Sequence, residues 1–151
     1  MVTCRIWAGA LALVCAAAPA FAQAPQNAAG RIKVASGSVF IVRAGTLVPA
    51  QAGQELFEAD TLKTGADGRL GITLKDDTRI SLGPSSEVRV DRFVFAPAEG
   101  RMGLVLNIVR GVMAYVSGRI AKLSPDSIRL ETPAAVVGVR GTTLALHVLP
   151  K

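Results

Sequence analysis

Few side chains in this chain of 151 residues could act as nucleophiles, bases or metal ligands. His147 is the only histidine, and Cys4 and Cys15 are the only cysteines. Catalysis or metal binding needs several such groups to converge. Because His147 alternates with Leu146 and Val148, we expect it to face solvent alone. The motifs of nucleotide-binding loops, zinc proteases, serine hydrolases and calcium loops are absent. We therefore predict a protein that is not an enzyme and needs no cofactor or metal.

The carboxylates that could serve as an acid–base pair stand beside glycine, threonine or each other. Asp67 precedes a glycine, and Asp76-Asp77 lies between two apolar segments. An aspartate side chain can bond to the backbone two residues further on, so we interpret these acids as turn formers. A hydrolase whose two acids meet from distant strands is the last of three functional hypotheses.

Basic residues give the chain a formal net charge of +6. This charge favours anionic surfaces without specifying one. The basic residues are dispersed, and stacking platforms are scarce, so we do not expect nucleic-acid binding. The aromatic residues beyond residue 22, interpreted mostly as core, are Phe40, Phe57, Phe93, Phe95 and Tyr115. Arginines recur at nearly regular intervals, and five are predicted contacts for a protein partner or an anionic polymer: Arg79, Arg89, Arg110, Arg119 and Arg129.

Residues 1–22 have the form of a secretory signal peptide. Arg5 is their only charged residue, an apolar run follows it, and Ala20-Phe21-Ala22 offers small residues for cleavage. The apolar run is shorter than the roughly 20 residues of a membrane span. Lipid attachment at Cys15 is a poor alternative because bulky Val14 precedes it. We expect cleavage near Ala22.

Cleavage there predicts a periplasmic or secreted protein with no stable membrane span. Both cysteines would leave with the signal peptide, which excludes disulfides and thiolate chemistry. Residues 23–30 are polar and small and are predicted to be a flexible tether. Residues 31–148 are then long enough for a single domain with a sizeable core.

The elements that must position these side chains are predicted to be short β-strands. Apolar segments rich in valine, isoleucine and leucine alternate with glycine, aspartate, serine and proline turns. Few windows after residue 30 sustain a helical period, so the fold class is all-β. A sandwich, a barrel and a solenoid all satisfy this pattern. The predicted strands cover residues 39–42, 70–74, 79–82, 88–95, 104–109, 112–116, 128–130, 136–139 and 144–148.

The order of motifs from Gly53 to Leu82, together with Val139-Arg140-Gly141-Thr142, resembles the FecR domain. That domain is the extracytoplasmic part of bacterial regulators of siderophore-dependent surface signalling. The resemblance covers about residues 30–148 and implies a twisted, solenoid-like stack of short strands, which we adopt over a sandwich or barrel. It also implies a set of structural motif residues: Asp60, Thr64, Gly65, Gly68, Asp76, Asp77, Val139, Arg140, Gly141 and Thr142.

Several of these motif residues have predicted roles. Gly65 is expected to take a positive φ, and Gly141 to let the backbone turn closely. Asp77 stands where the family usually has glycine, which leaves the turn type open. Arg140 is predicted to be a buried or half-buried clamp between neighbouring turns, with an anion or partner contact as the alternative.

The leading functional hypothesis is a non-catalytic, exported interaction or scaffold module whose β surface docks an envelope protein. Relatives in the FecR family relay the state of an outer-membrane transporter to a sigma factor through a membrane helix. This chain lacks their cytoplasmic helical segment and second subdomain, so we expect a stand-alone module. The alternative is a binder of anionic envelope polymers, whose binding would weaken steeply with salt. The sequence does not identify the partner.

Overall fold

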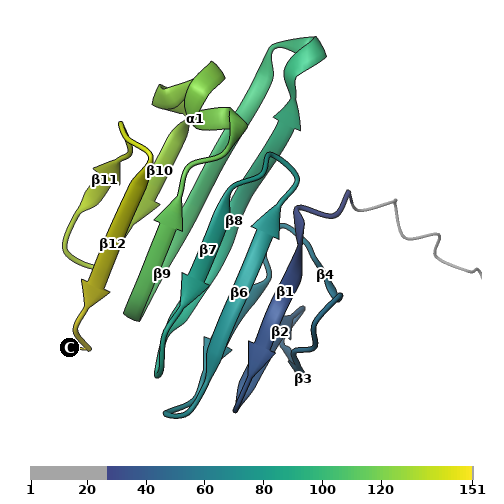
Figure 1. Ribbon diagram of the computed structural model, residues 1–151, viewed down its shortest axis with the longest axis vertical. Helices are drawn as coiled ribbons and strands as arrows, with labels where there is room; N and C mark the ends of the chain where they lie inside the picture. The colour runs from purple at the N-terminus through teal and green to yellow at the C-terminus, as the bar shows by residue number, and fades with distance from the viewer. Residues whose placement is uncertain (1–26, 151) are drawn as a thin grey trace, which may run out of the picture.

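Alternation of apolar and polar residues gives each strand one buried face. In the strand β7 (Arg79–Leu82), for example, Ile80 and Leu82 are buried while Arg79 and Ser81 are exposed. The computed structural model describes residues 27–150, and strands dominate it (Figure 1). The prediction of an all-β fold is confirmed. In the described residues the single α-helix has five residues.

The twelve strands are β1 (Gly30–Ser36), β2 (Val39–Arg43), β3 (Thr46–Pro49), β4 (Glu55–Leu56), β5 (Thr61–Thr64), β6 (Arg69–Leu74), β7, β8 (Glu87–Ala96), β9 (Arg101–Val116), β10 (Ile128–Glu131), β11 (Val136–Gly138) and β12 (Thr143–Val148). The helix α1 (Arg119–Leu123) and the 3-10 turns η1 (Pro97–Glu99) and η2 (Pro125–Ser127) complete the described elements.

The strands form one curled, open sheet in the order β3-β2-β5-β8-β9-β7-β6-β1-β4. β10 and β12 also pair with β9, and β11 pairs with β10. All pairs are antiparallel except β9 with β10. This strand order is not the expected solenoid stack. Tight turns, such as the one from β6 to β7, place consecutive strands side by side as antiparallel hairpins. The curled sheet is nearer to the barrel alternative.

The long strand β9 carries the sheet from one layer to the other. Its first part pairs with β8 and β10, and its last part pairs with β7 and β12. At Gly111 the backbone takes a φ of 96°, and the register with β8 shifts between Glu87 and Val88. An extra residue in one strand bends it and reverses the face that its side chains occupy. The buried side chains accordingly change from Leu104, Leu106 and Ile108 to Met113 and Tyr115.

Two layers therefore enclose the core. We call β3-β2-β5-β8-β9-β10-β11 the first layer and β4-β1-β6-β7-β9-β12 the second, with β9 shared (Figure 1). Burying each large apolar side chain contributes about 1.5–3 kcal/mol. The core includes Ile41, Leu62, Val90, Leu106 and Leu130 from the first layer and Ile32, Leu56, Leu70, Ile80 and Tyr115 from the second.

The N-terminal boundary differs from the predicted tether of residues 23–30. Ala29 is only 1% exposed, and its N–H donates to the Leu56 carbonyl oxygen at 2.7 Å. Gly30 begins β1. Both residues belong to the fold because their backbone groups complete the pairing of β1. The predicted signal peptide, residues 1–22, lies outside the described residues. Within residues 27–150 no helix has the length and apolar character of a membrane span.

Candidate functional site

Asp60 is a buried carboxylate held by an arginine. Arg43 donates from Nε to Oδ1 at 2.9 Å and from Nη2 to Oδ2 at 2.7 Å, and the Phe57 N–H donates to Oδ2 at 2.9 Å. The Arg43 guanidinium also lies over the Phe57 ring, with Cζ 4.5 Å from its centroid. Hydrogen bonding to Asp60 raises the pKa of Arg43. These contacts join β2 to the turn before β5, so the role of Asp60 is structural.

Asp76 is fully buried and links the β6–β7 turn to α1. Its carboxylate accepts hydrogen bonds from the Thr78 hydroxyl at 2.6 Å, the Thr78 N–H at 3.2 Å and the Ile120 N–H at 3.4 Å. Its carbonyl oxygen accepts the Arg119 N–H at 2.6 Å. The bond to the backbone two residues on confirms the prediction of a turn former. Gly118 allows this approach, because a Cβ there would lie 2.3 Å from the Asp76 carbonyl oxygen.

Asp77 adopts the left-handed conformation, with a φ of 67°. In a hairpin loop, a left-handed residue just before the second strand is a position that favours glycine. Asp77 occupies that position. We predict that Asp77→Gly raises the free energy of unfolding by about 0.5 kcal/mol, because glycine adopts this φ without steric cost. A urea titration measures the change, with Asp77→Ala, expected to be destabilising, as the control. A lower midpoint for Asp77→Gly would show that the aspartate side chain stabilises the turn.

Thr64 fastens β5 to the start of β8. Its hydroxyl donates to the Gly83 carbonyl oxygen at 2.7 Å and accepts the Ser86 N–H at 2.8 Å. The residue is buried, so both bonds are shielded from water. Thr64 therefore has a structural role, because it joins β5 to the loop between β7 and β8.

The two motif glycines after Thr64 are required for close packing. Gly65 does not have a positive φ, so that prediction was wrong. A Cβ on Gly65 would instead lie 2.8 Å from the Ser38 Cβ, and one on Gly68 would lie 2.4 Å from the Ser38 carbonyl oxygen. The turn between β1 and β2 occupies the space that side chains at these positions would need.

The C-terminal motif lies at the surface. Arg140 is not a buried clamp, because its side chain is 83% exposed and pairs with an equally exposed Asp126 at 3.2 Å. Such an ion pair contributes at most about 1 kcal/mol. Gly141 has an ordinary φ, and a Cβ added to it would meet no atom within 4 Å, so the expected close turn is also wrong. Val139 is the buried anchor of this loop, and Thr142 is exposed.

The five predicted contact arginines do not form a single ladder. They lie on four different strands and a helix, in both layers, rather than on successive stacked coils. Two of them have carboxylate partners in the described part of the chain. Arg89 pairs with Asp91, and Arg110 pairs with Glu87 at 3.6 Å. The positions are β7 for Arg79, β8 for Arg89, β9 for Arg110, α1 for Arg119 and β10 for Arg129.

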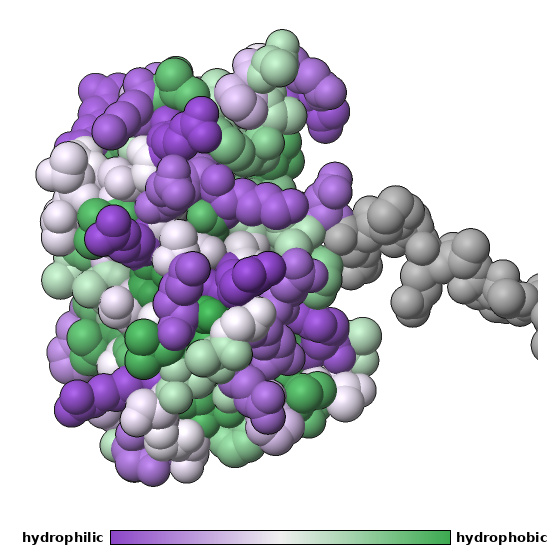
Figure 2. Space-filling model, turned by 45° about the vertical axis from the view of Figure 1, so that its right-hand side comes forward, coloured by the Kyte–Doolittle hydropathy of each residue, from purple (hydrophilic) through white to green (hydrophobic). Residues whose placement is uncertain are grey.

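The hairpin of β8 and β9 extends past the second layer and leaves an aromatic cleft beneath it. Phe93 and Phe95 belong to the inner face of β8, as do the fully buried Val88 and Val90, yet they are only half-buried. The surface is hollowed beneath the projecting hairpin (Figure 2). The cleft has a volume of about 880 Å³. We call it the aromatic cleft.

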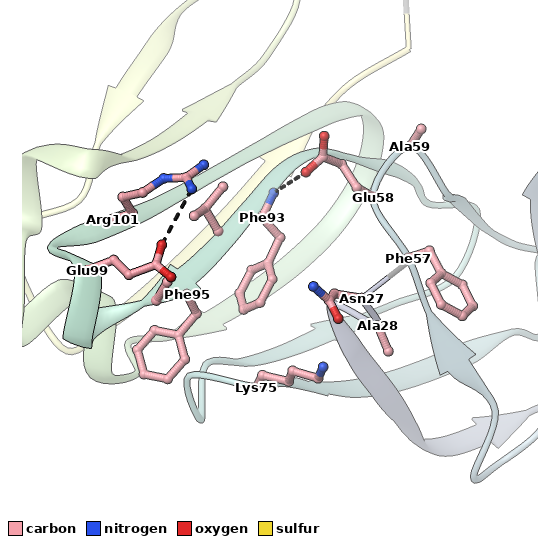
Figure 3. A pocket seen from close by; sticks show the side chains of 12 residues that line it. Asn27, Ala28, Phe57, Glu58, Ala59, Lys75, Phe93, Phe95, Glu99 and Arg101 are labelled. Atoms are coloured by element: carbon pink, nitrogen blue, oxygen red, sulfur yellow. Dashed lines mark hydrogen bonds and ion pairs between the residues drawn. The ribbon is translucent and has the colours of Figure 1, made fainter. Parts of the chain in front are cut away.

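Charged side chains surround the two rings (Figure 3). Lys75, from the β6–β7 turn, lies across the cleft from them. The Arg119 guanidinium stacks on Phe95, with Cζ 5.0 Å from the ring centroid. Glu58 accepts the Phe93 N–H at 3.2 Å, which holds the turn after β4 against the bulged part of β8. The cleft thus combines an apolar wall with charged groups of both signs, because Glu58, Glu99, Lys75 and Arg101 all line it.

The sequence did not reveal this cleft. Phe93 and Phe95 lie in a segment that is predicted to be a strand like its neighbours, so the phenylalanines were interpreted mostly as core. The available signal was that the predicted strand of residues 88–95 is longer than the predicted strands beside it. Among the cleft-lining residues there is no histidine or cysteine. In the described residues no group of three or more His, Cys, Asp or Glu side chains could hold a metal ion. The arrangement can bind an apolar side chain against the two rings, with charged groups nearby to orient it.

Comparison with known proteins identifies one family. A family model described as FecR protein matches residues 60–149, from Asp60 to the residue after β12. No curated protein and no solved structure matches the chain. FecR domains are regulatory and non-enzymatic. Because the matched segment is more than half of the chain, the protein belongs to the FecR family.

Proposed function

We propose that this protein is a non-catalytic interaction module that docks an envelope protein in the aromatic cleft. The observation that carries the proposal is the pair of half-buried phenylalanines on a hairpin that projects beyond its covering layer. A regulatory family without enzymatic activity supports an interaction role. The module, residues 29–148, acts in the periplasm or outside the cell after cleavage near Ala22.

The apolar wall of the cleft explains how a partner gains affinity. Val88 and Val90 are buried in the core, whereas Phe93 and Phe95 on the same face are only half-buried. Covering them removes apolar surface from water at about 25 cal/mol per Å². Aromatic residues in a recess are the usual centres of binding energy at protein interfaces. The partner therefore inserts an apolar side chain between the hairpin and the β6–β7 turn.

The cations at the cleft define the polar part of the partner. Within residues 27–150, neither Lys75 nor Arg119 has a carboxylate within 4 Å. An acidic residue next to the inserted apolar side chain would pair with them and orient the partner segment. The docked segment is accordingly a short acidic-apolar stretch of a protein.

We predict that Phe93→Ser reduces partner capture at least about tenfold, because serine removes the buried ring contact at the interface. The mature protein carries a photo-crosslinker in place of Glu99, an exposed residue that lines the cleft, and the partner is captured from envelope extract and identified by mass spectrometry. The matched control is Val34→Ser, an exposed apolar residue (56%) on the outer face of β1. Urea midpoints show whether each variant folds.

Two results would contradict this function. One is capture of the same protein by the Phe93→Ser variant at full yield. The other is capture of an anionic polymer that is released steeply with rising salt, which would support the polymer-binding alternative instead. Loss of a single protein from the Phe93→Ser variant, with retention by Val34→Ser, supports the aromatic cleft.

A further inference from the structure

The described sheet has edges that differ in how they are protected. β4 has two residues, β11 has three and includes Gly138, and β3 has four and ends at Pro49. Short edge strands and edge prolines are devices that prevent pairing with another chain. β12 has six residues, pairs only with β9, and contains no proline, charged residue or register shift. It is the unprotected edge.

The backbone groups that β12 offers can be assigned. The Ser117 N–H donates to the Thr142 carbonyl oxygen at 2.8 Å, so Thr142 bonds toward β9. Residues that bond to a neighbouring antiparallel strand alternate. The even-numbered residues of β12 therefore bond to β9, and the odd-numbered residues turn their N–H and C=O groups to the open edge: Thr143, Ala145 and His147.

We propose that β12 pairs antiparallel with β12 of a second copy about a two-fold axis, which joins two chains into one continuous sheet. The interface does not involve the aromatic cleft. A register centred on Leu146 places Leu146 opposite Leu146 of the second copy, and Leu144 opposite its Val148. It also pairs the open backbone groups of Ala145 with those of His147. Two-fold symmetry makes such an edge complementary to itself.

The side chains fit this occupant. Leu144, Leu146 and Val148 pack against the core but stay half-exposed, because no strand lies beyond them in the described sheet. In the dimer each gains an apolar partner on the same face, which continues the core across the axis. β12 carries no formal charge, so two chains of net charge +6 can pair there without opposed charges on the strands. Val136 on β11, the edge of the first layer beyond β9, is 65% exposed and adds apolar surface to this flank.

Sedimentation of the mature protein over a range of concentrations tests the proposal. The expected result is a monomer–dimer equilibrium that His147→Lys weakens at least about tenfold, because a charged edge opposes pairing. Leu47→Lys on the protected edge strand β3 is the control and leaves association unchanged. Phe93→Ser in the aromatic cleft also leaves it unchanged, so failure of this proposal and failure of the proposed function are distinguishable.

A cysteine substitution tests the register. Leu146→Cys faces its own copy across the axis, where opposite Cβ atoms of paired strands are about 4.5–5.5 Å apart, and oxidation should yield a disulfide-linked dimer. Thr143→Cys, opposite Leu149 of the second copy in this register, should not crosslink with itself. A chain that stays monomeric up to about 1 mM overturns the proposal. Dimers that form equally with His147→Lys, or that lack the Leu146→Cys crosslink, also overturn it.

Discussion

Asp60→Ala is expected to lower the free energy of unfolding by about 3 kcal/mol, because it leaves the Arg43 guanidinium and the Phe57 N–H without their shared acceptor. Removing one partner of a buried ion pair costs about 3–5 kcal/mol. Arg43 keeps 38% exposure and can turn to water, which places the expected cost at the lower end. Urea unfolding followed by circular dichroism measures it.

An exposed ion pair in the same region provides the control. Arg31 and Glu55 are 3.7 Å apart, and both side chains are more than half exposed, so Glu55→Ala should change stability by less than about 0.5 kcal/mol. The double variant Arg43→Met, Asp60→Leu should be more stable than Asp60→Ala, since it removes the unpaired charge. If the urea midpoint of Asp60→Ala equalled that of Glu55→Ala, the contacts of Asp60 with Arg43 and Phe57 would not stabilise the fold.

Gly111→Ala is expected to cost about 3 kcal/mol, and it acts through two separate effects. Its φ of 96° opposes any side chain, and a Cβ would lie 2.4 Å from the Ser86 Cα. The left-handed backbone contributes about 1–2 kcal/mol and the steric overlap about 1–3 kcal/mol. Thermal unfolding or urea titration measures the sum.

Two other glycines separate these effects. Gly100 has a φ of 66° and open space, so Gly100→Ala should show only the backbone cost of about 1 kcal/mol. Gly138 has neither constraint, and Gly138→Ala should be nearly neutral. Equal stabilities of the Gly111→Ala and Gly138→Ala variants would mean that β9 does not bend at Gly111.

The sequence predicted β7 and β12 well, in which inward apolar residues alternate without interruption, and also β8, in which a bulge interrupts the alternation. The boundaries of β7 are as predicted, while β8 is longer than predicted by one residue at each end and β12 by one residue at its start. Residues 104–109 and 112–116 were predicted as separate strands, because Gly111 resembles a turn signal. In the structure that glycine lies within one strand, two residues after a bulge at Val109. Sequence alone does not distinguish a turn from a bulge, since both use the same backbone conformation.

Features that depend on distant residues could not be predicted. α1 has only five residues and no side-chain cap of its own, and it is held by Asp76, 44 residues before Ile120. The role of Asp76 in its own turn was predicted, but its contact with the helix was not. The exposure of Phe93 and Phe95 likewise depends on where the second layer ends. The resemblance to the FecR domain implied stacked coils, but the order of motifs along the chain does not determine how the strands that carry them pair.

Because β9 belongs to both layers, it determines how the protein unfolds. Its amides bond to β8 and β10 in one layer and to β7 and β12 in the other. Neither layer can lose its central strand while the other keeps it. Native-state hydrogen exchange along β9 therefore requires opening of the whole molecule, and the amides on both sides of Gly111 share one exchange free energy equal to that of global unfolding.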